Sequence, residues 1–527
     1  MNGKLSVPLI GCVIFAVGTA APRQRTSAQN PGLPAFSPTI PKTWDDQSMA
    51  ILEVPLANPI GSPKHVSADY YYRIPVRPIY KSYPVYAPGH EPPVYMDSLK
   101  QREPVVVWDD KGHGPSLKTE VDWIKAGEIV FDAPVGLNVQ GDVTLAEVRE
   151  PAWYRKIATP VAKDGTMPFA CYVIREKGKV ELGALSCATC HTRVMPDGTT
   201  LKGAQGNFPF DRSLAYSYRA SVASAQDPSQ ALGDVRANER FLYAVPWLRP
   251  DPLANLDRMP VEYIASPHDA IPPGVLGRHR TSPFCPPQVP DLIGAKDRHY
   301  LDRTGLQQHR GIVDLMRYAA LNQGGDELAN YDGFIPADFG NLKKLPEPTD
   351  AENVGGRYSD EQLYALALYI YSLQPPPNPN KFDALATHGQ KVFEREGCAM
   401  CHTPPLYTNN KLTLAEGFTP PPGAEQKYDI LPISVGTDPD LALKTRRGTG
   451  YYKVPSLKGV WYRSMFGHSG SCATLEDWLD PRRTRDDYVP TGFKPYGAKT
   501  YAVKGHSFGL NLSAEDKRAL IAFLKTL

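Results

Sequence analysis

Two pentapeptides place two cysteines and a histidine at the same spacing: C-A-T-C-H at residues 187–191 and C-A-M-C-H at residues 398–402. C-x-x-C-H is the attachment signal of c-type haem. The thiols add to the two vinyl groups of one porphyrin, and the histidine supplies the proximal nitrogen to the iron. The sequence therefore predicts two covalently bound haem c groups, each with its iron. The predicted cofactor-binding residues are Cys187, Cys190, His191, Cys398, Cys401 and His402, with His191 and His402 as proximal iron ligands.

Zinc is the alternative for these motifs, because cysteine and histidine are also zinc ligands. Four-coordinate zinc needs a second pair of such residues, and no second pair stands within thirty residues of either motif. The spacing therefore favours haem over zinc.

The composition excludes several classes of protein. The 58 basic residues are balanced by 56 acidic ones, so nothing in the charge suggests binding to nucleic acid or to an anionic membrane surface. Proline is frequent, with 53 of 527 residues against about 5% in an average protein. Because proline interrupts helices and strands, we expect a large share of loops and extended chain.

The first 28 residues are typical of a signal peptide. Lys4 precedes a mostly apolar stretch from 5 to 21, and small residues near Ala21 and Ala28 offer cleavage sites. A lipoprotein signal at Cys12 is the alternative. No later stretch is long and apolar enough to span a bilayer. We therefore expect a periplasmic or secreted protein with no transmembrane span in the mature chain.

Three further cysteines, Cys171, Cys285 and Cys472, lie outside the motifs and the signal. An oxidising compartment permits one disulfide among them and leaves one free thiol. Three buried thiols are the alternative.

The chain divides by composition into four parts. Residues 1–28 are the signal, and residues 29–160 form a Pro/Tyr-rich, partly β extension without a haem motif. Residues 161–376 and 377–527 are each expected to form a cytochrome c-like haem domain, with the proline run at 375–379 between them. The fold class is expected to be mainly α and loop-rich.

Local patterns predict individual elements. Residues 105–108 and 128–131 are expected to form short strands, and residues 171–174 and 179–182 a hairpin that leads into the first motif. The tyrosine- and proline-rich stretch 70–93 is expected to be extended. Helices are expected at 311–322, 359–373, 384–396 and 513–527, the last directly before the C-terminus.

The helices at 359–373 and 513–527 also resemble each other, and each follows one haem motif. Their serine caps, acidic first turns and apolar positions align in the same order, which indicates a duplication. The aligned pairs are Ser359/Ser513, Glu361/Glu515, Ala365/Ala519, Leu366/Leu520, Tyr369/Phe523, Ile370/Leu524 and Leu373/Leu527.

Several stretches resemble the bacterial dihaem cytochrome c peroxidase superfamily. K-V-P-S-L-K-G-V at 453–460, H-S-G-S at 468–471 and A-T-L-E at 473–476 are similar to that family's segment beyond the second haem. The overall plan resembles the dihaem rubber oxygenases, with similar stretches at 194–198, 203–207 and 505–509. The chain after the second motif is shorter than in those oxygenases, which argues against a long-polymer substrate.

The resemblance also bears on the distal iron ligands. In the peroxidases a methionine often precedes the histidine of the H-x-G-S stretch and binds the second iron, but here that position is Gly467. The oxygenase-like pattern uses histidine on both faces of that iron. The candidates for the distal position, in order, are His506, His468 and Met465. For the first haem only His299 and His309 come into question.

The resemblance implies a peroxidase- or oxygenase-like oxidoreductase whose first haem has an open iron position, fed with electrons by the second. The alternative is a non-catalytic electron carrier with both irons six-coordinate. Expected partners are a small redox protein or a quinol-linked electron donor or acceptor, and peroxide or dioxygen as oxidant; no catalytic side chain is identified. The oxidant, the organic substrate and the oligomeric state stay open.

Overall fold

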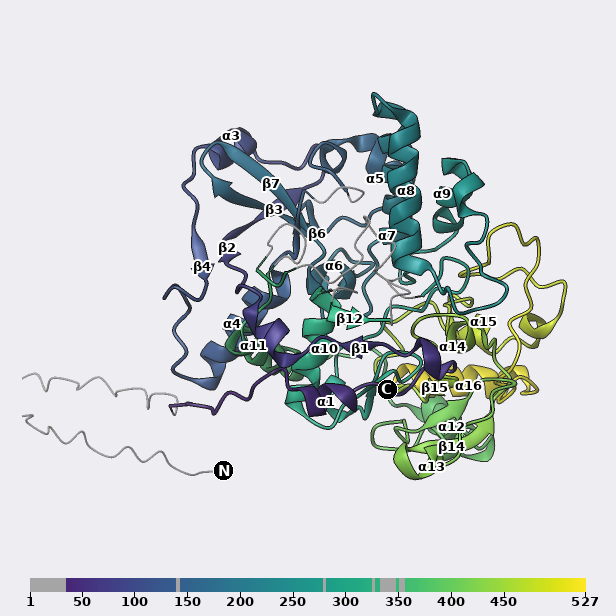
Figure 1. The fold of residues 1–527 in the computed structure, drawn as a ribbon. Coiled ribbons are helices and arrows are strands. Elements are labelled where there is room, and N and C mark those ends of the chain that lie inside the picture. The colour runs from purple at the N-terminus through teal and green to yellow at the C-terminus, as the bar shows by residue number, and fades with distance from the viewer. Residues whose placement is uncertain (1–34, 139–142, 278–280, 325–327, 332–346, 350–355) are drawn as a thin grey trace, which may run out of the picture.

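The computed structural model describes residues 35–138, 143–277, 281–324, 328–331, 347–349 and 356–527 (Figure 1). The predicted signal peptide lies outside the described residues. Within these ranges no helix is both long enough and apolar enough to cross a membrane.

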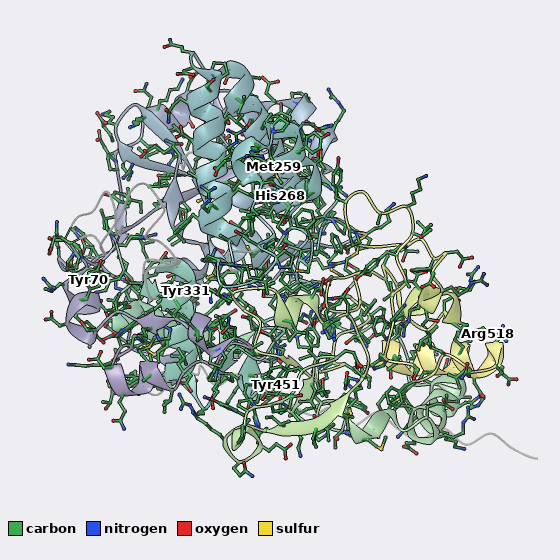
Figure 2. All side chains as sticks on the ribbon, turned by 45° about the vertical axis from the view of Figure 1, so that its right-hand side comes forward. Tyr70, Met259, His268, Tyr331, Tyr451 and Arg518 are labelled. Atoms are coloured by element: carbon green, nitrogen blue, oxygen red, sulfur yellow. The ribbon has the colours of Figure 1, made fainter. Side chains whose placement is uncertain are left out.

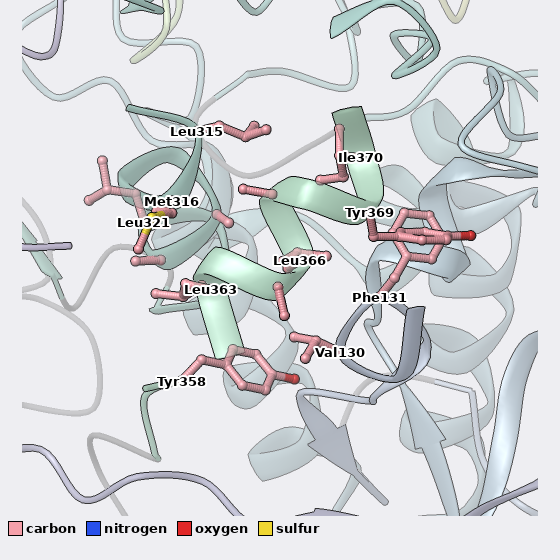
Figure 3. Close-up of a cluster of buried hydrophobic side chains, with 14 of the residues drawn as sticks. Val130, Phe131, Leu315, Met316, Leu321, Tyr358, Leu363, Leu366, Tyr369 and Ile370 are labelled. Carbon is pink, nitrogen blue, oxygen red and sulfur yellow. The ribbon is translucent and has the colours of Figure 1, made fainter. Parts of the chain in front are cut away.

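A crossed pair of helices, α4 (Glu120–Asp132) and α11 (Asp360–Ser372), lies in the largest core cluster. The two backbones touch at Gly127, where an added Cβ would lie 2.0 Å from the carbonyl oxygen of Ala365. One helical turn further along both helices, the ring centroids of Phe131 and Tyr369 are 5.2 Å apart. Figure 3 shows both rings on facing helices.

The same crossing recurs between α12 (Ala384–Arg395) and α16 (Ala514–Lys525). An added Cβ on Gly389 would lie 1.9 Å from the Ala519 carbonyl oxygen, and the Phe393 and Phe523 ring centroids are 5.3 Å apart. Both pairs are visible in Figure 1, α4 with α11 at the left and α12 with α16 at the lower right. On α11 and α16 the two contacts use pairs that the internal repeat aligns, Ala365 with Ala519 and Tyr369 with Phe523.

The helices α12 and α16 confirm the helices predicted there, whereas α4 contradicts a predicted strand. Residues 128–131 were expected to form a strand, because Ile129, Val130 and Phe131 favour β-structure when taken alone. A capping box between Thr119 and Asp122 instead starts a helix that continues through them. The predicted boundary at residue 160 also falls between the two helices of the first pair.

A four-stranded sheet, in the order β3–β6–β7–β5, leads into the first motif. It contains β3 (Ser82–Tyr86), β6 (Thr166–Glu176), β7 (Lys179–Ala184) and β5 (Gly136–Leu137). The antiparallel pairing of β6 with β7 confirms the predicted hairpin. Directly after it comes α6, which is the first motif itself, Cys187–His191.

The region between the motifs contains more helix than the sequence patterns predicted. α10 (Ile312–Gly324) confirms the helix expected there. α7 (Phe210–Ser224), α8 (Pro228–Tyr243) and α9 (Val261–Asp269) were not expected. The start of α8 carries a recognisable signal, because Asp227 caps it and proline stands at its first position.

These three helices are tied together by an ion cluster around His268, which Figure 2 labels. Its Nδ1 lies 2.9 Å from Asp211 of α7 and its Nε2 lies 3.3 Å from Glu239 of α8. Burial alone would lower the pKa of His268, but the two carboxylates raise it to about 10. A charged imidazolium paired on both sides gives this cluster a structural role.

The remaining elements are short. The helix α2 (Ala68–Arg73), capped by Ser67, corrects the expectation of extended chain from Tyr70, since the prolines begin only at Pro75. The other helices are α1 (Asp46–Ala50), α3 (Tyr95–Lys100), α5 (Pro151–Ile157), α13 (Ala424–Lys427), α14 (Asp440–Leu443) and α15 (Leu475–Trp478). The other strands are β1 (Lys64–His65), β2 (Ile79–Tyr80), β4 (Val106–Trp108), β8 (Thr192–Val194), β9 (Thr200–Lys202), β10 (Tyr300–Leu301), β11 (Gln307–Gln308), β12 (Ala329–Asn330), β13 (Leu412–Leu414), β14 (Ile430–Ser434) and β15 (Tyr451–Lys453).

Candidate haem sites

The first motif forms a single helical turn that is fixed at its start. Ser186 caps α6 and forms a capping box with Thr189. The Thr189 hydroxyl also donates to the Phe169 carbonyl oxygen of β6 at 2.7 Å. The hairpin therefore sets the position of the motif, and Cys187 packs against the core of the α4–α11 pair.

The second motif follows α12 almost directly. Gly397, with a φ of 72°, ends the helix, and Cys398–Met400 forms a 3₁₀ turn. Cys398 and Ala399 pack against the core that contains Phe393 of α12 and Phe523 of α16. Each motif thus lies beside one of the two equivalent helix pairs.

Both motif histidines have the same orientation. His191 Nδ1 lies 3.1 Å from the Pro290 carbonyl oxygen, and His402 Nδ1 lies 3.1 Å from that of Pro455. A ring nitrogen facing a carbonyl must carry the proton, which leaves Nε2 as the lone-pair nitrogen. Metal-bound histidines characteristically donate their second N–H to such a partner. Both rings therefore hold the tautomer that an iron at Nε2 requires.

His506 stands opposite His402, with the two ring centroids 6.4 Å apart. An imidazole nitrogen lies about 2 Å from the metal it binds and about 1.1 Å from its own ring centre, so two imidazoles on one metal have centroids about 6 Å apart. The His506 Nδ1 atom is buried and has no hydrogen-bond partner. Burial, with His402 and Arg483 nearby, lowers the pKa of His506 to about 4, so the ring is neutral. The pair fits a haem iron held between two histidines.

A buried arginine holds the backbone of His506 in place. The Arg483 guanidinium donates to the carbonyl oxygens of Gly505 at 3.0 Å and of His506 at 2.8 Å. It also lies over the Trp478 ring at 4.4 Å. His506 itself has a φ of 45°, a left-handed conformation that a non-glycine residue adopts only when its surroundings enforce it.

The other two distal candidates face elsewhere. His468 stacks on Tyr452 with a centroid separation of 3.5 Å, and its Nε2 lies 2.8 Å from the Thr437 hydroxyl. Met465 packs with Val275 and Phe493 in a small separate core. The geometry therefore places His506, and neither of these two, against His402.

Both histidines considered for the first iron have other partners in this structure. His309 uses both ring nitrogens, at 2.6 Å from the Arg298 carbonyl oxygen and at 2.6 Å from the Tyr371 hydroxyl. His299 is exposed and lies 3.2 Å from the Asp429 carboxylate.

In the part of the chain that the structure describes, no group of three or more His, Cys, Asp or Glu side chains is arranged to hold a metal ion. Cys171, Cys285 and Cys472 are free thiols, not a disulfide. Burial raises the pKa of Cys171 to about 11 and those of Cys285 and Cys472 to about 12, so all three thiols are protonated.

No protein-family model and no curated protein matches the sequence. Among solved structures, the chain is similar to hydrazine synthase of Kuenenia stuttgartiensis at 16% identity and a TM-score of 0.28, over 56% of this chain and 87% of that one. It is also similar to a MauG-like protein associated with microbial copper homeostasis, at 16% identity and a TM-score of 0.27, over 46% and 75% of the two chains. These weak similarities leave the function to be argued from the sites themselves.

Proposed function

We propose that this chain is an exported dihaem c-type cytochrome, mainly α and loop-rich, that transfers electrons through two covalently bound haems. The observation that carries the proposal is the shared geometry of the motif histidines. Both direct Nδ1–H to a proline carbonyl and so keep Nε2 for iron. Bound haem supplies the redox chemistry, and the chain supplies the thiols, the axial nitrogens and the buried surroundings that set the potentials.

Two equivalent modules are part of this proposal. Each contains a glycine-bearing helix, a C-x-x-C-H turn and a terminal helix that crosses the first. In this scheme the first module begins with α4, inside the predicted extension, and the second with α12. The remaining chain before α4, together with the β6–β7 hairpin, is an addition to the first module.

The second haem is assigned to electron storage and transfer. In this proposal His402 and His506, whose ring centroids are 6.4 Å apart, would both bind the second iron and leave no site for an oxidant. Two strong ligands also avoid ligand exchange during electron transfer. A small redox protein or a quinol-linked donor is the expected source of electrons.

The first haem is assigned to a peroxidase- or oxygenase-like reaction. Supporting this, His299 and His309 are engaged elsewhere. An iron with only His191 bound leaves room for peroxide or dioxygen. The alternative, a pure electron carrier, requires a second strong ligand on this iron as well.

Carbon monoxide binding separates these two alternatives. The reduced wild-type protein is expected to bind one carbon monoxide per chain, at the first haem. Removal of the second axial ligand in a His506→Ala variant is expected to raise this to two. Optical titration of the reduced protein measures the stoichiometry. If the wild type binds neither carbon monoxide nor cyanide in any redox state, the chain is an electron carrier.

A further inference from the structure

A small cavity lies beside the two backbone segments that support the motif histidines. It has a volume of about 30 Å³, room for roughly two water-sized groups. Its walls include Pro290 and Pro455, the residues whose carbonyl oxygens accept from His191 and His402. The cavity therefore adjoins the supports of both proximal ligands at once.

Four cationic side chains also line this cavity, and none of them forms an ion pair with a carboxylate among the described residues. Arg298 donates to the carbonyl oxygens of Asp291 and Ile293, and Lys453 donates to that of Tyr300 at 3.3 Å. The Nε of Arg463 is buried without any partner. The four, here called the basic cluster, are Arg298, Arg303, Lys453 and Arg463.

One carboxylate, Asp291, lines the cavity, and it is already engaged. It accepts from the Tyr462 hydroxyl at 2.7 Å and from the Ile293 N–H at 3.0 Å. Four cations and a single carboxylate therefore line the cavity. Such an excess of partly buried like charge is unfavourable unless an anion from outside the polypeptide compensates it.

Burial, and after it the neighbouring cations, lowers the pKa values of two members of the basic cluster. Burial, with Arg298 and Arg303 nearby, lowers the pKa of Lys453 well below its usual value. Burial, with Arg463 and Arg298 nearby, lowers that of Arg303 to about 9. The groups are thus close enough to act on one anionic ligand together.

We propose that the basic cluster binds carboxylate oxygens, one propionate from each of the two haems, and thereby joins the haems electrostatically. The inference rests on the proposed function, since each covalent haem would bring two propionates. The presence of both Pro290 and Pro455 in the cavity wall and the room for about two small groups favour this source. A free inorganic oxyanion would bind the same cations, so the experiment must distinguish it from the haem propionates.

The test is spectroelectrochemical titration of the full-length haem protein. Arg303→Gln and Lys453→Met each remove one cation and are expected to lower the midpoint potential of both haems. We expect about a tenfold change in the reduction equilibrium, which is about 59 mV for a one-electron couple. Arg303→Lys, which keeps the charge but not the guanidinium, should shift them less. The control is Lys458→Met, an exposed lysine five residues after Lys453 that leaves the cavity unchanged.

Two further measurements identify the anion. If propionates are bound, removal of a cation raises the propionate pKa, because the lost cation no longer favours the ionised carboxylate. The midpoint potentials of the variants should then rise as the pH falls through this pKa, at a higher pH than in the wild type. Wild-type potentials should also be insensitive to inorganic phosphate at constant ionic strength. If the wild-type potentials change with the phosphate concentration, the anion bound by the basic cluster is a free oxyanion and not a propionate. Potentials equal to those of the Lys458→Met control would overturn the inference, although the haem count would still support the proposed function.

Discussion

Replacing His506 by alanine is expected to convert the second haem from low spin to high spin. The His506 ring lies 6.4 Å from the His402 ring, centroid to centroid, and its neutral state leaves a nitrogen lone pair for the iron. Without it, the iron keeps one strong axial ligand. Electronic absorption and electron spin resonance spectra of the oxidised protein should show one low-spin haem lost per chain.

The matched control is His468→Ala, which removes an imidazole that is stacked on Tyr452 and bonded to Thr437. Its spectra should equal those of the wild type. If His506→Ala leaves the spectra unchanged while His468→Ala or Met465→Ala alters them, the assignment of the distal ligand is wrong.

Replacing Arg483 by glutamine is expected to have nearly the same spectral effect without touching a ligand. Its guanidinium is fully buried and donates to the carbonyl oxygens of Trp478, Val503, Gly505 and His506. Hydrogen bonds that involve a charged group contribute about 1.5–3 kcal/mol each. Their loss should release His506 from its left-handed conformation, so that a large fraction of the second haem becomes high spin.

The neighbouring residue provides the control for this variant. Arg482 is exposed and pairs with Asp480, so Arg482→Gln should leave both spectrum and stability unchanged. Thermal unfolding followed together with the low-spin band separates positioning from general stability. A less stable Arg483→Gln protein that keeps a fully low-spin second haem would show that Arg483 does not position the ligand.

The sequence was most informative where the chemistry depends on neighbouring residues. The two motifs, the serine caps of α11 and α16 and the β6–β7 hairpin all depend on residues within a few positions of one another. The ranking of His506 as the first distal candidate stays a prediction, and its ring lies 6.4 Å from that of His402, centroid to centroid.

The role of α4 was missed because its partner lies far away in the sequence. Its pattern G-E-I-V-F at 127–131 matches G-Q-K-V-F at 389–393, which precedes the second motif. In the second module that helix runs straight into the motif, whereas the sheet strands separate the two in the first. The run of β-favouring residues at 129–131 indicated a strand, but the contact of Gly127 with Ala365 of α11 belongs to a helix.

The basic cluster and Arg483 could not be found from sequence for the same physical reason. Arg298, Arg303, Lys453 and Arg463 come from two distant segments, and only folding brings them to one cavity. Arg483 lies among charged residues of the same kind, and its neighbour Arg482 is exposed. Nothing local distinguishes the buried arginine from the solvated one.

The most direct test of the central claim is the number of haems that stay attached to the denatured chain. After extraction with acidified acetone, the pyridine haemochrome should correspond to two haems per polypeptide. Replacing both cysteines of one motif by alanine, Cys187 with Cys190 or Cys398 with Cys401, should lower the count by about one, because both thioether anchors of that haem are then lost. Complete extraction of the colour, or zinc in place of iron by metal analysis, would contradict the account.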